Sequence, residues 1–151
     1  MKRAVLALAV LMLISCGSNP KTINGTWQAA LANTDGSVAY TFLTSLTQGT
    51  GSTVSVSNFG FNSPASCFTS SLGETAVFSV SGNSNGYQTG SFQMTITTAF
   101  PEGVNNVLTL NGTRNSDGGI SGNWTVTGLT RCPGNGTFTM HVLIPVDPPA
   151  H

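Results

Sequence analysis

The chain has 151 residues, of which five are Lys or Arg, five are Asp or Glu, and only 7% are charged, against about 25% in an average soluble domain. A chain of this length is expected to form one domain, and without a basic patch it does not suit nucleic acid as a partner. Two His and five scattered acids are a poor stock for acid–base catalysis or metal ligation. We therefore expect no enzyme activity, no metal and no cofactor.

The first residues predict export. Met1-Lys2-Arg3 is positively charged, and an apolar run from Ala4 to Ile14 follows it, as in a secretory signal. The run is too short to span a membrane, which takes about 20 apolar residues. It ends at Leu13-Ile14-Ser15-Cys16, which resembles the lipobox of bacterial lipoproteins, with Ile14 where a small residue is more usual. That resemblance implies that Cys16 is the first residue of the mature protein and carries a diacylglyceryl group and an acyl chain such as palmitate.

The lipobox divides the chain into four parts. We expect a signal peptide at residues 1–15, the lipidated Cys16 with a short linker at 16–21, a β-barrel domain at 22–145 and a flexible Pro-rich tail at 146–151. The mature chain keeps three basic and five acidic side chains, a net charge of −2. The expected location is the cell envelope, anchored to the outer membrane at its periplasmic face or at the cell surface. The alternative is an ordinary secretory signal with an incidental Cys16.

Two further cysteines remain once Cys16 is assigned to the lipid. Cys67 and Cys132 form an even pair in an exported chain, and we expect one disulfide between them because the compartment is oxidising. Neither belongs to a Cys-x-x-Cys motif or has a His beside it, which argues against a metal site.

The rest of the chain has the pattern of an all-β domain. Short stretches rich in Val, Thr, Phe and Ile alternate with period two and are separated by Gly, Asn, Asp and Ser clusters, which predicts strands joined by turns. The expected strands are Ile23–Leu31, Val38–Thr47, Thr53–Phe61, Thr75–Ser81, Tyr87–Thr98, Val107–Arg114, Gly119–Thr127 and Gly136–Ile144. Asn33–Gly36 and Asn115–Gly118 carry Asp-Gly turn signals, and the alternation slips near Ser57-Asn58, which predicts a bulge.

Eight strands with short turns favour a single small antiparallel up-and-down barrel, because closure removes exposed edges. Its first strand would pair with its last. Ile23-Asn24-Gly25-Thr26-Trp27 and Ile120-Ser121-Gly122-Asn123-Trp124 share the pattern Ile-x-Gly-x-Trp. The Gly-x-Trp of the first strand resembles that of the calycins, the group of lipocalins and avidin-like proteins, and implies a barrel of that kind. An avidin-type biotin site needs several more Trp residues, so no binding residue is carried over.

Aromatic side chains dominate the expected interior. An eight-stranded barrel is just wide enough to be filled by side chains or to hold one small ligand, and both outcomes stay open. We expect Trp27 and Trp124 to lie near each other inside, because the first strand pairs with the eighth. The candidate interior and ligand-contact residues are Trp27, Tyr40, Phe42, Phe78, Phe92, Trp124 and Phe138.

Other motifs have simpler explanations. Gly82-Asn83-Ser84-Asn85-Gly86 matches the Gly-x-Ser-x-Gly nucleophile motif, and Asp117 and His141 follow in hydrolase order. That motif requires a strand–turn–helix, whereas this segment is expected to be a hairpin turn. Four Asn-x-Thr triplets, beginning at Asn24, Asn111, Asn123 and Asn135, fit the glycosylation pattern but are explained as strand and turn composition in a bacterial protein.

Three functions are compatible with these features. The first is a lipid-anchored, non-enzymatic barrel of the cell envelope that binds an unidentified ligand or an envelope protein. The alternative is a lipocalin-like carrier of a small apolar molecule. A third is an integral outer-membrane barrel, in which the apolar face of each strand would point to lipid; the small number of Tyr and Trp residues disfavours it.

Overall fold

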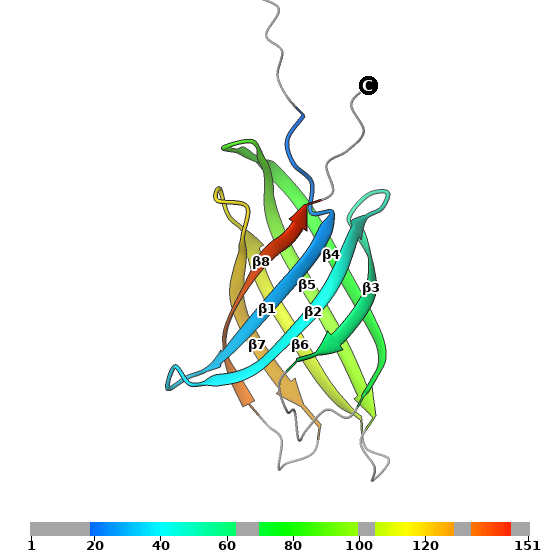
Figure 1. The fold of residues 1–151 in the computed structure, drawn as a ribbon, viewed down its shortest axis with the longest axis vertical. Coiled ribbons are helices and arrows are strands. Elements are labelled where there is room, and N and C mark those ends of the chain that lie inside the picture. The colour runs from blue at the N-terminus through cyan, green and yellow to red at the C-terminus, as the bar shows by residue number, and fades with distance from the viewer. Residues whose placement is uncertain (1–18, 63–69, 100–104, 129–133, 146–151) are drawn as a thin grey trace, which may run out of the picture.

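Each strand of the mature chain has one apolar face, and the fold buries these faces inside a barrel. The computed structural model describes residues 19–62, 70–99, 105–128 and 134–145. They form eight antiparallel strands, each paired with the next in sequence, and the last strand pairs with the first to close the barrel (Figure 1). The strands are β1 (Gly25–Asn33), β2 (Val38–Gln48), β3 (Thr53–Phe61), β4 (Ser70–Ser84), β5 (Tyr87–Ala99), β6 (Asn106–Arg114), β7 (Ile120–Thr127) and β8 (Gly134–Pro145).

The predicted all-β, up-and-down barrel is confirmed, and most strand boundaries agree closely with those expected. The clear exception is β4, which is longer at both ends than predicted. Its Gly73 and Gly82 resemble turn residues in the sequence, but they lie at register shifts within the strand, where bulges absorb an extra residue. The turn that follows consists of Asn85 and Gly86, with φ of 49° and 79°, as in the type I′ turns of hairpins.

The bulge predicted in β3 is also confirmed. Asn58 has φ of 52°, and the pairing of β3 with β2 shifts between Leu43 and Ser45. The shift returns Phe59 and Phe61 to the side of the strand that packs against the core. Among the described residues, β3 pairs with β4 only through Thr53 with Val77 and Val54 with Ala76, so this pairing ends before the bulge.

The interior of the barrel is packed with apolar side chains. Among the described residues, nineteen apolar ones form one buried cluster, and most of these expose 2% or less of their surface. A cavity large enough for water would leave exposed surface on the side chains that line it, so the space around these residues is filled. The largest of these fully buried side chains are Trp27, Trp124, Phe42, Phe78, Phe92 and Phe138.

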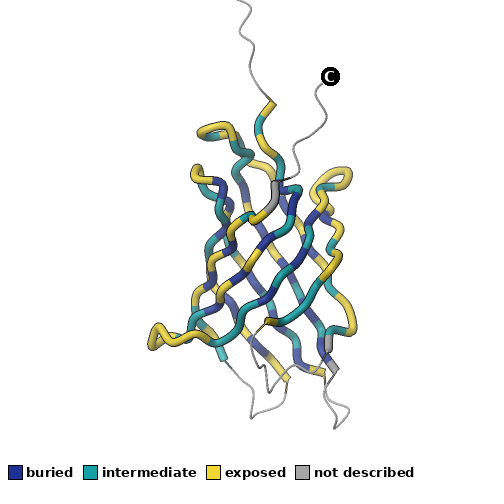
Figure 2. The backbone as a smooth tube through the Cα atoms, in the orientation of Figure 1, coloured by how far each residue is buried: buried dark blue, intermediate teal, exposed yellow. Residues whose placement is uncertain are grey.

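The outer face of the described barrel is mostly polar and carries little charge, with a few exposed apolar side chains such as Leu72, Val77 and Val80 on β4. Exposed and buried residues alternate along the strands (Figure 2), and the outward positions of β5, β6 and β7 are mostly Thr, Ser, Asn and Gln. The described strands β5 to β8 contain one formally charged side chain at neutral pH, Arg114, and that residue is only 4% exposed. The wall formed by β5 to β8 is therefore neutral.

Arg114 closes the upper end, where the N-terminal segment enters the barrel (top of Figure 1). Its guanidinium lies 5.7 Å from the ring centroid of Trp27 and 5.3 Å from that of Tyr87. It donates hydrogen bonds to the carbonyl oxygens of Gly118, at 3.2 Å, and Lys21, at 2.9 Å. Burial lowers the pKa of Arg114 from its ordinary value, but an Arg stays charged at neutral pH. The cation therefore covers the core and ties three segments together.

Candidate functional site

The structure places the predicted aromatic residues on the inner side of the barrel, with one difference among them. Trp27, Trp124 and the four predicted Phe residues are buried, whereas Tyr40 is only partly buried and packs at the edge of the core. Burial raises the pKa of the Tyr40 phenol above its usual value. The six fully buried rings are therefore packed, and the described interior shows no space for a ligand beside them.

The expected proximity of the two tryptophans is wrong. Trp27 pairs with Val142 near the upper end, under Arg114. Trp124 pairs with Gly136, which in turn pairs with Asn33 at the far end of β1. The strands of a barrel are tilted and staggered, so equivalent places in β1 and β7 lie at different heights. The two rings thus belong to opposite ends of the barrel.

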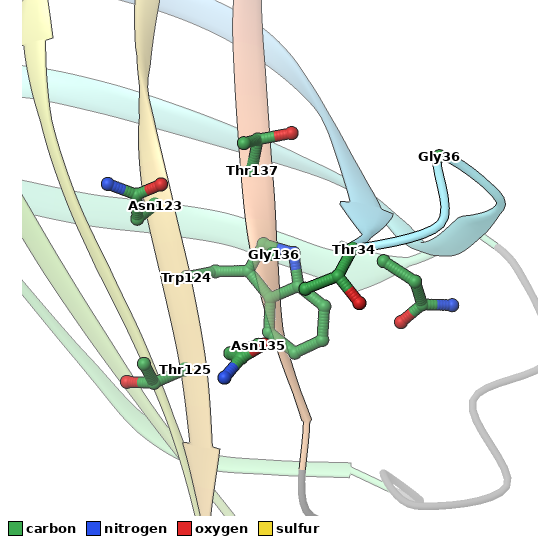
Figure 3. Close-up of a pocket in the computed structure, with 9 residues that line it drawn as sticks. Thr34, Gly36, Asn123, Trp124, Thr125, Asn135, Gly136 and Thr137 are labelled. Atoms are coloured by element: carbon green, nitrogen blue, oxygen red, sulfur yellow. The ribbon is translucent and has the colours of Figure 1, made fainter.

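Among the described residues, a concave site lies on the outer wall at the lower end (Figure 3). It is a groove of about 590 Å³ between β7, β8 and the hairpin that joins β1 to β2. This volume falls within the range of about 300–1,000 Å³ typical of small-molecule sites. The groove is lined by Asn33, Thr34, Gly36, Asn123, Trp124, Thr125, Asn135, Gly136 and Thr137.

Two Asn-x-Thr triplets form the wall of this groove. Asn123 pairs with Thr137, and Thr125 pairs with Asn135, so each amide lies beside a hydroxyl on the neighbouring strand. All four residues are exposed. Side chains at paired positions have Cβ atoms about 4.5–5.5 Å apart, and residues two apart on a strand are about 6.8 Å apart. The result is a small lattice of amides and hydroxyls.

The middle residues of the two triplets, Trp124 and Gly136, lie behind the groove. They are paired with each other, and the buried Trp124 indole reaches from β7 across β8 (Figure 3). A Cβ on Gly136 would lie 1.9 Å from the carbonyl oxygen of Ala32 and 2.8 Å from the indole Nε1. The indole Nε1 donates a 2.8 Å hydrogen bond to the same carbonyl. Gly136 therefore makes room for the ring behind the groove.

The hairpin on the other side of the groove is rigidly bonded. The Asp35 carboxylate accepts hydrogen bonds from the Ser37 backbone N–H, at 2.9 Å, and from the Ser37 hydroxyl, at 2.6 Å. These bonds hold the pKa of Asp35 below its ordinary value. Gly36 has φ of 84°, which confirms the Asp-Gly turn expected here. Asp35 does not line the groove, so the groove itself carries no charge.

The groove side chains differ from other amides of the same wall. Gln93 donates a 2.9 Å hydrogen bond to Asn111 on the next strand, and Asn115 bonds Ser121 at 3.0 Å. By contrast, the side chains of Asn123, Thr125, Asn135 and Thr137 make no hydrogen bond to any other residue that the structure describes. Their donors and acceptors are available to a ligand in the groove.

The other sequence motifs lie apart from the groove. Ser84 pairs with Tyr87 at the tip of the β4–β5 hairpin, so the Gly-x-Ser-x-Gly segment forms a hairpin and not a strand–turn–helix. The Asp117 carboxylate accepts a hydrogen bond from the Gly119 backbone N–H, and His141 is exposed on β8. Within the described ranges, no group of three or more His, Cys, Asp or Glu residues is placed to hold a metal ion.

Several predicted residues lie outside the described part of the chain. They are Cys16, Cys67 and Cys132, together with the signal peptide and the Pro-rich tail. The lipidation and the disulfide therefore stay predictions.

The comparisons with known proteins found no match to this chain. A scan against protein-family models, a search of curated proteins and a search of solved structures each returned no match. In the part of the chain that the structure describes, no helix is long and apolar enough to cross a membrane.

The groove was not expected from the sequence, although the sequence holds a signal for it. The Asn-x-Thr triplet at Asn123 lies within the expected strand Gly119–Thr127, and the triplet at Asn135 begins one residue before the expected strand Gly136–Ile144. Two such triplets on consecutive antiparallel strands come into register when the connection is centred between them, as it is here.

Proposed function

We propose that this protein is a lipid-anchored, non-enzymatic binding module of the cell envelope, and that it binds through the groove on its outer wall and not inside the barrel. The observation that carries the binding role is the groove itself, in which four exposed amide and hydroxyl side chains lie unbonded to the described protein over a packed interior. The anchor rests on the lipobox at Cys16.

Hydrogen bonds at the upper end of the barrel hold Lys21, the residue from which the chain leads back to the proposed anchor. The Lys21 backbone N–H donates a 2.7 Å hydrogen bond to the Gly86 carbonyl, and the Lys21 carbonyl accepts one from the Gln88 N–H at 3.0 Å. Four residues separate Lys21 from Cys16, a reach of at most about 18 Å from the barrel to the lipid, given about 3.5 Å per residue. The barrel would therefore stand close to the membrane with its upper end toward the surface.

This orientation places the groove away from the membrane. The hairpin at Asn33–Ser37 lies at the end of β1 opposite to the N-terminal entry (Figure 1). A ligand in the surrounding space would reach the groove without crossing the lipid surface. In the same orientation, the neutral wall of β5 to β8 would face along the membrane surface and not into it.

The direction of the side chains argues against an integral outer-membrane barrel. Such a barrel presents an apolar band to lipid, whereas most apolar residues of this barrel lie inside and its outward positions on β5 to β7 are mostly Thr, Ser, Asn and Gln. The exposed apolar residues include Leu72, Val77 and Val80 on β4 and Leu143 on β8, which do not form a band around the barrel. A carrier of a small apolar molecule would need an internal void beside its aromatic side chains. The six buried rings expose 2% or less, so such a carrier would have to open its core.

The anchor is tested by replacing Cys16 with Ser. We expect Cys16→Ser to leave the membrane fraction or to keep its uncleaved signal, and we expect Cys67→Ser, a matched loss of another cysteine, to stay attached. Alkaline carbonate extraction and the mass of the mature protein are the measurements. Membrane attachment of Cys16→Ser at the normal processed mass would contradict the anchor.

A further inference from the structure

We infer that the groove between β7, β8 and the β1–β2 hairpin binds a neutral oligosaccharide. The inference deepens the proposed function, since it names the class of ligand for the groove, but it does not depend on the lipid anchor. It rests on the chemistry of the lining, the state of its hydrogen-bonding groups and the size of the site.

The lining selects against most classes of ligand. An anion or a nucleic acid needs Lys or Arg, and a cation needs carboxylates, but the lining contains none of these residues. A bulky apolar ligand needs large apolar side chains to pack on, and the one in the lining, Trp124, is 1% exposed. The apolar surface that the lining does expose therefore comes from small groups of its Thr, Asn and Gly residues, each beside a polar group. The groove therefore suits a neutral ligand that is rich in hydroxyl groups.

The lattice of side chains fits such a ligand. Each Asn amide supplies two donors and an acceptor, and each Thr hydroxyl can donate or accept. Asn123, Thr125, Asn135 and Thr137 offer both kinds of group from two neighbouring strands, and Thr34 adds a hydroxyl from the hairpin. A sugar ring carries hydroxyls around its whole edge, so it can engage several of these groups at once.

The backbone holds this lattice in place before any ligand binds. The four side chains stand on paired strands. β8 pairs with β1, and the Trp124 indole ties β7 to β1 through its hydrogen bond to the Ala32 carbonyl. A site built on rigid strands loses little entropy on binding. The volume of about 590 Å³ has room for a short oligosaccharide and not for a large folded partner.

The test is a binding titration on the full-length lipidated protein in a detergent without a sugar headgroup. The probes are cellohexaose, chitohexaose and maltohexaose, with heparin as an anionic contrast, followed by intrinsic Trp fluorescence and calorimetry. We expect one neutral hexasaccharide to bind saturably at one site while heparin does not. No saturable binding of the three neutral sugars up to about 10 mM, where even a weak site would be filled, would overturn the inference.

Variants locate the site. We expect Asn135→Ala and Thr137→Ala each to weaken binding by roughly five- to tenfold, as for the loss of one hydrogen bond. Asn83→Ala and Thr75→Ala are matched controls, because both residues are exposed on β4, and we expect them to bind as the wild type does. Equal affinities for all four variants would contradict the assignment of the groove.

Two further outcomes separate this inference from the proposed anchor. If Cys16→Ser binds the hexasaccharide as the wild type does but leaves the membrane, both proposals hold. Membrane attachment without any neutral sugar binding would retain the anchor and reject this ligand class. Self-association through the groove would also reject this ligand class; sedimentation would show it as dimers that disappear in Asn135→Ala.

Discussion

The two ends of the barrel carry the same Ile-x-Gly-x-Trp pattern but differ in what surrounds the tryptophan. Both indoles are buried, and each donates a 2.8 Å hydrogen bond to a backbone carbonyl, Trp27 to Ile23 and Trp124 to Ala32. At the upper end a cation covers Trp27. At the lower end Trp124 meets the ring of Tyr40 edge-on, with centroids 5.5 Å apart, and lies behind the groove.

This difference separates a structural end from the end proposed to bind a ligand. At the upper end, Arg114 donates its hydrogen bonds to the carbonyls of Lys21 and Gly118. At the lower end, the ring supports two strands whose groove side chains, those of Asn123, Thr125, Asn135 and Thr137, are unbonded to the rest of the described protein. The same local motif therefore supports closure at one end and the groove proposed to bind a ligand at the other.

The largest expected effect comes from removing either ring. We expect Trp27→Ala and Trp124→Ala each to lower the free energy of unfolding by about 3–5 kcal/mol, the usual cost of truncating a buried Trp. That is a large share of the roughly 5–15 kcal/mol that stabilises a typical domain. Urea unfolding followed by circular dichroism measures it. If both variants stay within about 1 kcal/mol of the wild type, the packed interior is wrong.

A second large effect concerns the lower end alone. The strands that flank the two cysteines, β3 with β4 and β7 with β8, have their connected ends at the lower end of the barrel (Figure 1). We expect a bond between Cys67 and Cys132, and we expect reduction to cost on the order of 4 kcal/mol in the chain-entropy model. Peptide mapping without reductant and melting with and without it provide the measurement. Two thiols that alkylate freely in the native exported protein would exclude the bond.

The upper end is tested by shortening its cation. We expect Arg114→Ala to destabilise the barrel by about 2–3 kcal/mol, because two carbonyls lose a charged donor and the Trp27 ring loses its cover. Arg114→Lys should recover part of this loss, since one ammonium cannot reproduce both bonds. Chemical unfolding of the three proteins is the measurement. An Arg114→Ala protein as stable as the wild type would show that the cation does not hold this end closed.

The lower end has a matched pair of glycine variants. We expect Gly136→Ala to cost about 1–3 kcal/mol, as overpacking does, because the new Cβ would meet the Ala32 carbonyl at 1.9 Å. It should also weaken sugar binding, since the Trp124 ring must shift. Gly60→Ala is the control, with nothing within 4 Å of its Cβ. Equal stability of the two variants would contradict the close approach at Gly136.

The fold could be predicted from the sequence because period-two alternation and turn chemistry are local signals. The Asp-Gly turns, the bulge near Asn58 and all eight strands were expected from neighbouring residues. The length of β4 was not, because Gly73 and Gly82 signal turns locally and only pairing with β5 turns them into bulges.

The site was harder to predict because it depends on register across strands. The stagger that separates Trp27 from Trp124 accumulates around the whole barrel, and no short segment encodes it. The groove forms where Asn123 meets Thr137 and Thr125 meets Asn135, which requires the pairing of β7 with β8. The role of Arg114 was missed for the same reason, since it bonds Lys21 at a sequence distance of 93 residues.

The most direct test uses the two indole N–H groups as reporters, one at each end. With ¹⁵N-labelled Trp, the protein should give two indole signals, both protected from exchange by their bonds to Ile23 and Ala32. We expect the neutral hexasaccharide that binds to shift the Trp124 signal and to leave that of Trp27 unchanged, while a fatty-acid probe shifts neither. A fatty acid that shifts either signal at stoichiometric concentration, or a bound sugar that leaves Trp124 unmoved, would contradict a packed barrel that binds through its outer wall.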